Sequence, residues 1–211
     1  MQLTNTLTKQ KEDFVPRENK QVKMFVCGPT VYDYIHIGNA RTFVFFDVVA
    51  KYFRYIGYQV DYLQSITDID DKLIERAKKQ ADPNTDIATA VTALAQKYTE
   101  LFRENVLALG ITAVDKYLAA TDHIKEIIAQ VKKLIDTKHA YQIENDGWYF
   151  DLSTFPEYGK LSGRTATMAD DAVSQIDENS KKRNRGDFCL WKFSKLGEPG
   201  WDWETGHQKT I

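Results

Sequence analysis

The chain has 211 residues, of which 43% are hydrophobic and 27% charged, and a formal net charge of −2. These values are ordinary for a globular protein with a buried core, and the charge argues against nonspecific binding of nucleic acid. With no apolar run of membrane-spanning length, no signal-peptide pattern, and only Cys27 and Cys189 as thiols, we expect a cytoplasmic protein without a disulfide framework.

Near the N-terminus the apolar pattern predicts a strand, a loop, a helix and a second strand. Alternation over residues 22–27 favours a strand that ends at Gly28 and Pro29. Apolar residues then recur at helical spacing from Asn39 to Ile56, and Gly57 occupies the position expected of a helix C-cap. Residues 58–66 again favour a strand, so the segment is a βαβ unit, typical of a parallel α/β sheet.

Further along, helical periodicity covers residues 87–102 and 124–135, and "TDIDDK" at residues 67–72 favours a capping turn with a solvated acidic face. Asn145-Asp146-Gly147 between two short apolar runs predicts a β-hairpin. Residues 180–185 are expected to form an exposed loop, and a last strand begins near Asp187. We predict an α/β fold: residues 1–110 form half of a nucleotide-binding domain, and residues 111–211 an α+β insertion.

The candidate site is the loop between the first strand and the first helix. Ligands of open α/β sheets bind beyond the carboxyl ends of the strands, and a helix N-terminus attracts phosphate. Gly38 would let a base or ribose approach the backbone, and His36 could donate a hydrogen bond to a phosphoryl oxygen. Cys27 alone has two readings: a small core residue, or a thiolate facing a pocket.

Five segments in order resemble the N-terminal part of the catalytic domain of cysteinyl-tRNA synthetases, which are class I aminoacyl-tRNA synthetases. They are "NTLTKQKEDFVP", "MFVCGPTVYDYIHIGNARTFVFFDVVAKYFRYIGY", "ITDIDDKLIERA", "YGKLS" and "DFCLWKFSKLGEPGW". The resemblance implies a Rossmann-like core of the class I synthetase (HUP) type with a connective insertion. It also implies ATP-dependent activation of L-cysteine, with Mg²⁺, and its transfer to tRNA(Cys).

The same resemblance assigns roles to individual residues. It makes Cys27 a ligand of Zn²⁺, a metal that prefers the thiolate of a substrate cysteine over a serine hydroxyl. It places Gly28 and Thr67 in the cysteine pocket. It places four residues in the ATP site: Thr30, His36, Gly38 and Asn39. Two of them, His36 and Asn39, would be catalytic members of the HIGH signature. In this sequence Asn39 replaces the final His of that signature.

The resemblance is incomplete towards the end of the sequence. The lysine-bearing KMSKS loop and the family's other zinc ligands, a Cys, a His and a Glu, find no match, and the tail departs from the family pattern after Trp201. The "KFSK" of residues 192–195 follows a predicted strand and is interpreted as structural. We therefore expect this chain alone to be an inactive monomer that binds tRNA weakly or not at all and does not bind membranes.

Three alternatives remain open at the level of sequence. One is the cysteine ligase of mycothiol synthesis, which shares the use of zinc and cysteine. Another is a small nucleotidyltransferase with a similar histidine signature, although such enzymes need neither Cys27 nor the insertion. The third is a synthetase-like binding module that keeps the pocket without the catalysis.

Overall fold

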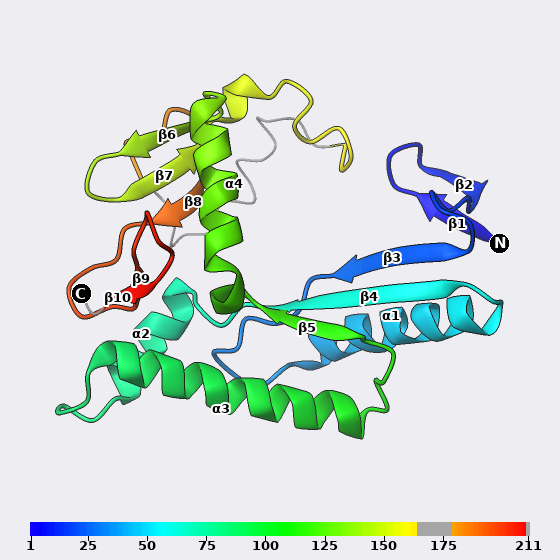
Figure 1. Ribbon diagram of the computed structural model, residues 1–211, viewed down its shortest axis with the longest axis horizontal. Helices are drawn as coiled ribbons and strands as arrows, with labels where there is room; N and C mark the ends of the chain where they lie inside the picture. Colours follow the sequence, from blue (N-terminus) through cyan, green and yellow to red (C-terminus); the bar gives the residue numbers. More distant parts are fainter. Residues whose placement is uncertain (164–178, 210–211) are drawn as a thin grey trace. The chain divides into compact units, whose positions relative to one another are not determined.

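The computed structural model describes residues 1–163 and 179–209 (Figure 1). The chain divides into two compact units, each built from two stretches of sequence. Unit 1 comprises Met1–Val15 and Lys125–Ser194, and unit 2 comprises Pro16–Ile124 and Lys195–Ile211. The predicted α/β class is confirmed, since unit 2 is organised around a parallel sheet flanked by helices.

The sheet of unit 2 has three parallel strands in the order β3-β4-β5. Two crossovers connect them, the first through α1 and the second through α2 and α3. The bounds are β3 (Gln21–Val26), α1 (Ile37–Tyr55), β4 (Gln59–Ile66), α2 (Asp71–Gln80), α3 (Ile87–Ala108) and β5 (Lys116–Ala119). The predicted strand–helix–strand unit is therefore confirmed as β3-α1-β4. Unit 2 also holds a short antiparallel pair, β9 (Gly200–Trp201) and β10 (Gln208–Lys209).

Local capping explains where the helices of unit 2 begin and end. Asp70 accepts a hydrogen bond from the Lys72 N–H and caps α2, which confirms a capping role in the "TDIDDK" segment. Asp86 does the same for α3 through the N–H of Thr89. Gly57 follows the end of α1 with a φ of +89°, a left-handed conformation that favours glycine.

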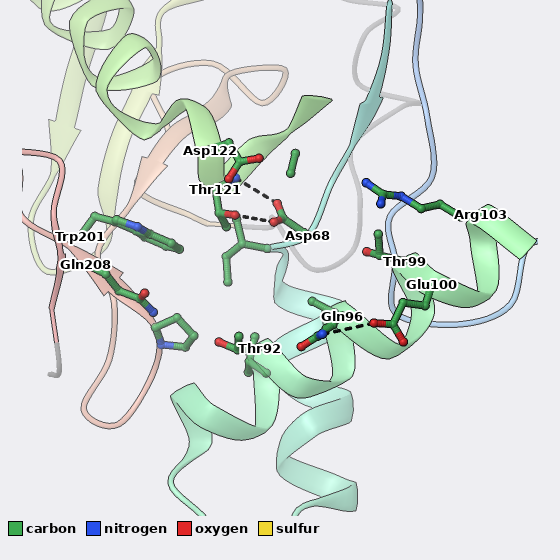
Figure 2. Close-up of a pocket in the computed structure, with 15 residues that line it drawn as sticks. Asp68, Thr92, Gln96, Thr99, Glu100, Arg103, Thr121, Asp122, Trp201 and Gln208 are labelled. Carbon is green, nitrogen blue, oxygen red and sulfur yellow. Dashed lines mark hydrogen bonds between the residues drawn. The ribbon is translucent and has the colours of Figure 1, made fainter. Parts of the chain in front are cut away.

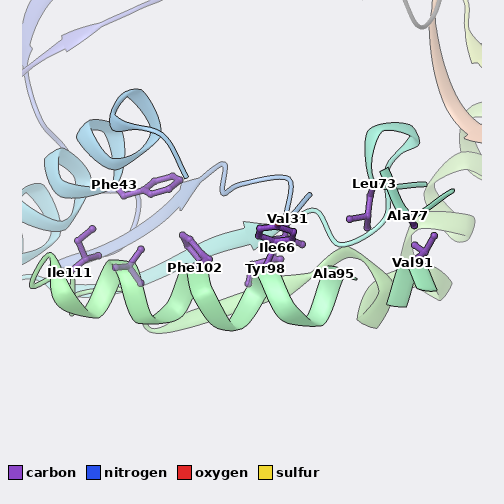
Figure 3. Close-up of a cluster of buried hydrophobic side chains, with 11 residues drawn as sticks. Val31, Phe43, Ile66, Leu73, Ala77, Val91, Ala95, Tyr98, Phe102 and Ile111 are labelled. Carbon is purple, nitrogen blue, oxygen red and sulfur yellow. The ribbon is translucent and has the colours of Figure 1, made fainter. Parts of the chain in front are cut away.

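The core of unit 2 lies where α1 and α3 pack against the sheet (Figure 3). Phe43 of α1, Ile66 of β4 and Phe102 of α3 share one buried cluster, so both helices cover the same face of β4. The α3 residues of this cluster recur at helical spacing and include Val91, Ala95, Tyr98, Phe102 and Val106. Each large side chain buried here contributes about 1.5–3 kcal/mol relative to an exposed one.

The described residues of unit 1 form two antiparallel arrangements, one α-helix and the short 3₁₀ helix η2 (Leu152–Thr154). A hairpin joins β1 (Gln2–Asn5) to β2 (Gln10–Asp13). A three-stranded sheet has the order β6-β7-β8, with β6 (Ala140–Ile143), β7 (Gly147–Phe150) and β8 (Phe188–Lys192). All but the first residue of α4 (Ile124–Asp136) belong to this unit. The predicted hairpin is confirmed between β6 and β7, where Asn145 adopts a φ of +60°.

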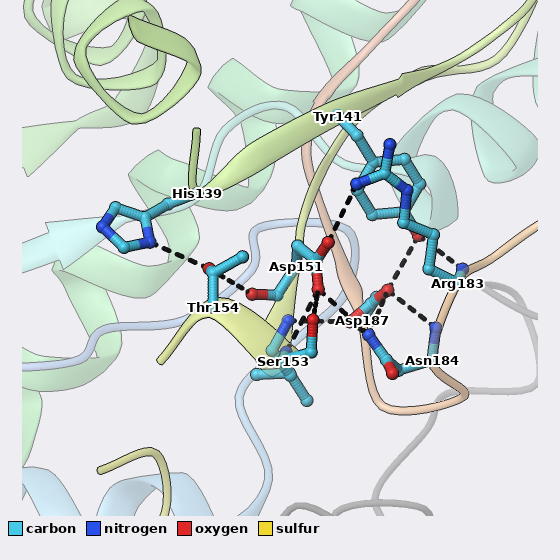
Figure 4. A network of polar contacts seen from close by, with 9 residues as sticks. His139, Tyr141, Asp151, Ser153, Thr154, Arg183, Asn184 and Asp187 are labelled. Carbon is cyan, nitrogen blue, oxygen red and sulfur yellow. Dashed lines mark hydrogen bonds and ion pairs between the residues drawn. The ribbon is translucent and has the colours of Figure 1, made fainter. Parts of the chain in front are cut away.

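Two buried carboxylates organise the loops of unit 1 (Figure 4). Asp187 accepts hydrogen bonds from the Tyr141 hydroxyl and from the N–H groups of Leu152 and Asn184. Asp151 pairs with Arg183 at 3.0 Å. The loop at residues 180–185, which was predicted to be exposed, is thus anchored by the ion pair of Arg183 with Asp151. The Arg183 guanidinium also lies 4.2 Å from the centre of the Tyr141 ring.

Two further observations concern domain organisation. β5 and the short 3₁₀ helix η1 (Ala120–His123) lie beyond residue 110 yet belong to unit 2, and β5 pairs with β4. The division of function at residue 110 stays a prediction. Among the described residues, no helix combines the length and apolarity needed to cross a membrane.

Candidate active site

The turn after β3 is joined to the end of β4 by a short series of hydrogen bonds. The Gly28 N–H donates to Ser65 Oγ at 3.0 Å. The Thr67 N–H donates to the Pro29 carbonyl at 2.9 Å, and the Val31 N–H donates to the Thr67 carbonyl at 3.1 Å. The parallel pairing of β3 and β4 therefore continues past both strand ends and holds the Cys27–Thr30 turn beside Thr67.

Gly28 has a steric role in this turn. A Cβ atom at this position would lie 1.6 Å from the carbonyl oxygen of Ser65 and 3.2 Å from Cγ of Gln64. Because the obstacle is backbone, no side-chain rotation could relieve it. Only glycine lets the two chain segments come this close.

His36 caps the N-terminus of α1. Its Nδ1 accepts a hydrogen bond from the Gly38 N–H at 2.9 Å. In a neutral imidazole whose Nδ1 accepts, the proton resides on Nε2, so that atom is the donor available to a ligand. The side chain of His36 is exposed. A Cβ on residue 38 would lie 2.6 Å from Cε1 of His36. Glycine at this position therefore avoids a steric clash with the imidazole ring.

The predicted site residues all lie at the carboxyl end of the parallel sheet. Cys27, Gly28 and Thr30 follow β3, Thr67 follows β4, and His36, Gly38 and Asn39 begin α1 or directly precede it. Thr30 and Thr67 form an isolated parallel bridge, and the contacts above join Gly28 to the same place. The roles assigned to these seven residues stay predictions.

The described residues do not fit a metal site. Cys27 is exposed, and across residues 1–163 and 179–209 there is no cluster of three or more His, Cys, Asp or Glu side chains that could hold an ion. One thiolate falls short of the three protein ligands that a catalytic zinc site uses.

A cavity of about 550 Å³, with both polar and apolar lining residues, opens beside the segment that follows Thr67 (Figure 2). One wall is the polar face of α3, and the others come from the ends of β4 and β5 and from the β9–β10 segment. The lining residues include Asp68, Gln96, Glu100, Arg103, Thr121 and Trp201. None of the predicted site residues lines it.

Sequence reasoning missed three residues that shape this region. Ser65 holds the Gly28 turn, and Asp68 accepts hydrogen bonds from the Thr121 N–H at 3.0 Å and from its hydroxyl. Arg76 of α2 pairs with Asp33 in the loop before α1. The one available signal was position, since Ser65 and Asp68 flank Thr67 at the end of a predicted strand.

Solved structures place this architecture in a known class. Methionyl-tRNA synthetase of Mycobacterium tuberculosis, solved with methionyl-adenylate, aligns with 61% of this chain and 24% of its own at a TM-score of 0.52 and 21% identity. A putative arginyl-tRNA synthetase from Campylobacter jejuni covers 72% of this chain and 45% of its own at a TM-score of 0.50 and 14% identity. The fold, including the Rossmann-like parallel sheet, is that of class I aminoacyl-tRNA synthetases.

Sequence comparison makes the assignment more specific. Residues 13–209 match the family described as tRNA synthetases class I (C) catalytic domain. The cysteine–tRNA ligase of Desulforamulus reducens is 46% identical, and the match covers 98% of this chain and 41% of the ligase. The cysteine–tRNA ligase of Pyrococcus furiosus is 43% identical, and the match covers 96% of this chain and 40% of the ligase. The chain belongs to this family of class I tRNA synthetase catalytic domains, and it spans about two-fifths of the length of these relatives.

Proposed function

We propose that this chain forms the part of a cysteine–tRNA ligase that binds cysteine and ATP at the carboxyl end of the parallel sheet. The complete reaction would activate L-cysteine with ATP and transfer it to tRNA(Cys). The observation that carries the proposal is the hydrogen-bonded junction that fixes the Cys27–Thr30 turn beside Thr67, next to the capped N-terminus of α1.

In the activation step, the cysteine carboxylate attacks the α-phosphorus of ATP, an oxygen–phosphorus bond forms, and pyrophosphate leaves. No side chain has to remove a proton, because the attacking carboxylate is already ionised at neutral pH. The protein contributes position and charge stabilisation. His36 would donate from Nε2 to a phosphoryl oxygen, the first N–H groups of α1 would face the phosphates, and Asn39 would add an amide donor.

The amino acid would lie against the Cys27–Thr30 turn, which hydrogen bonds hold beside Thr67. Gly28 and Thr67 would line the bottom of the cysteine pocket, and Thr30 would lie between that pocket and the nucleotide. A Cys27 thiolate is a soft donor suited to Zn²⁺, and Cys27 would supply one ligand of such an ion. Mg²⁺ would accompany ATP. A cytoplasmic location, a monomeric state and weak or absent binding of tRNA by this chain stay predictions.

The proposal can be tested by adding a non-hydrolysable cysteinyl-adenylate analogue to the ¹⁵N-labelled 211-residue chain and following its amide resonances. We expect the largest shifts at Gly28, Gly38, Asn39 and Thr67. His36→Ala should weaken binding by roughly ten- to a hundredfold, the range expected on losing a hydrogen bond to a charged group. His207→Ala, which changes an exposed histidine in the β9–β10 turn, should leave the affinity unchanged.

Two results would contradict the proposal. The first is a set of chemical-shift changes centred on the cavity lined by Asp68 and Trp201, with the α1 N-terminus unaffected. The second is equal binding by the wild-type chain and His36→Ala. Either would remove the nucleotide from the start of α1.

A further inference from the structure

The loop of residues 31–35 connects the Cys27–Thr30 turn to His36, which caps α1. Its first residue, Val31, is fixed by a hydrogen bond to the Thr67 carbonyl. Its last residue, Ile35, precedes His36, whose ring accepts a hydrogen bond from the Gly38 N–H. The position of the His36 imidazole therefore depends on what holds the middle of this loop.

The middle of the loop is held by Arg76 of α2. One terminal nitrogen of its guanidinium pairs with Asp33 Oδ2 at 2.5 Å, and the other donates to the Tyr98 hydroxyl of α3 at 2.9 Å. The guanidinium also lies 5.2 Å from the centre of the Tyr98 ring. The ring of Tyr34 packs edge-on against the same tyrosine, at 5.5 Å between centroids and 87° between planes. One arginine thus links the loop to two helices at once.

The charge state of Asp33 supports this link. The Arg76 hydrogen bond, followed by that of the Tyr34 N–H, lowers the pKa of Asp33 below its ordinary value. A carboxyl group with a lowered pKa in the folded state stabilises the fold above its ordinary pKa, and loses this effect as pH falls through the lowered value. The pair is therefore intact throughout the neutral range.

The arrangement is poorly suited to stability alone. The Asp33 side chain is 44% exposed, and exposed ion pairs contribute little to folding. In addition, Arg76 Nε is buried without a hydrogen-bond partner among the described residues, which costs free energy. What Arg76 does provide is geometry, because a planar guanidinium fixes two acceptors relative to one another.

We propose that Arg76 is a positioning residue that, through Asp33, sets the loop of residues 31–35 and so the place of His36 at the nucleotide. This inference rests on the proposed function for its consequence in binding. The structural part, that Arg76 immobilises the loop, stands without it.

The test uses the whole chain and two substitutions from opposite sides of the pair, Arg76→Met and Asp33→Asn. Without ligand, ¹⁵N relaxation order parameters at residues 33–38 should fall from about 0.85, typical of rigid backbone, to below about 0.6 in both variants. With the cysteinyl-adenylate analogue, both should raise the Kd by roughly tenfold, and the double variant should be no worse than either single one because the pair acts as a unit. Arg76→Lys should restore loop rigidity and affinity only in part, since a lysine ammonium lacks the planar pair of N–H groups with which the guanidinium contacts Asp33 and Tyr98 together.

Lys78→Met is a matched control. Lys78 lies on the same helix two residues further on, and it pairs with Glu198 at 2.6 Å rather than with the loop. It should leave the order parameters of residues 33–38 and the Kd at wild-type values. This separates a loss of the loop link from a general loosening of α2.

The outcomes separate the two proposals. Rigid loop order parameters in both Arg76→Met and Asp33→Asn would overturn the positioning role, whatever happens to the melting temperature. Loosening of the loop with an unchanged Kd would overturn its consequence for the nucleotide. Absence of analogue binding in the wild-type chain would instead contradict the proposed function, and the order parameters would still decide whether Arg76 holds the loop.

Discussion

Replacing Gly28 by alanine is expected to destabilise unit 2 by about 3 kcal/mol or more, because the new Cβ would meet the Ser65 carbonyl oxygen at 1.6 Å. The chain can relieve this overlap only by separating the turn after β3 from the end of β4. That movement would break the hydrogen bonds from Gly28 to Ser65 and from Thr67 to Pro29. Urea unfolding followed by circular dichroism would measure the loss.

Gly57→Ala is the control for this substitution. Gly57 has a φ of +89° but no atom within 4 Å of an added Cβ, so alanine there meets only backbone strain of about 1–2 kcal/mol. The account requires Gly28→Ala to cost clearly more than Gly57→Ala. Equal losses would mean that the turn can adapt, and that the junction is not what fixes the site.

The second large effect is expected in unit 1, from Asp187→Ala. Asp187 is 1% exposed and accepts from the Tyr141 hydroxyl at 2.8 Å and from the Leu152 and Asn184 N–H groups, each at 2.9 Å. Alanine would leave the buried Tyr141 hydroxyl and Leu152 N–H without this acceptor, and it would also remove the acceptor of the partly buried Asn184 N–H. Such a loss costs about 3–5 kcal/mol. The sheet formed by β6, β7 and β8 should then lose protection in hydrogen-exchange mass spectrometry.

Asp136→Ala removes a carboxylate of the same unit that is exposed at the end of α4, and it should change stability by no more than about 0.5 kcal/mol. Peptides from β3, α1 and β4 should keep wild-type exchange rates in Asp187→Ala, since these elements belong to the other compact unit. Wild-type exchange in β6–β8 of Asp187→Ala would show that the buried network does not hold this sheet.

Much of unit 2 followed from local sequence signals. The β3-α1-β4 order was predictable because apolar periodicity and the glycine after α1 act within a few residues of one another. The hairpin at Asn145 was predictable for the same reason. β5 was missed, since Lys116–Ala119 is a four-residue strand defined by its pairing with β4 rather than by its own pattern.

The candidate site was less accessible to sequence reasoning. Its motif residues came from resemblance to a family, whereas the contacts that position them join distant parts of the chain. Ser65 is 37 residues from Gly28, and Arg76 is 43 residues from Asp33. No periodicity links such pairs, so only the folded chain reveals Ser65 and Arg76 as supports of the turn and the loop.

The central claim is most directly tested by cysteine-dependent ATP–pyrophosphate exchange in a chimera. This chain would replace the matching N-terminal 41% of the Desulforamulus reducens cysteine–tRNA ligase. We predict exchange that requires cysteine, is not supported by serine, and falls by roughly 10²–10³ in His36→Ala, as expected for loss of one charge-stabilising donor. A folded chimera that shows no exchange, or one whose exchange is unchanged by His36→Ala, would contradict the account.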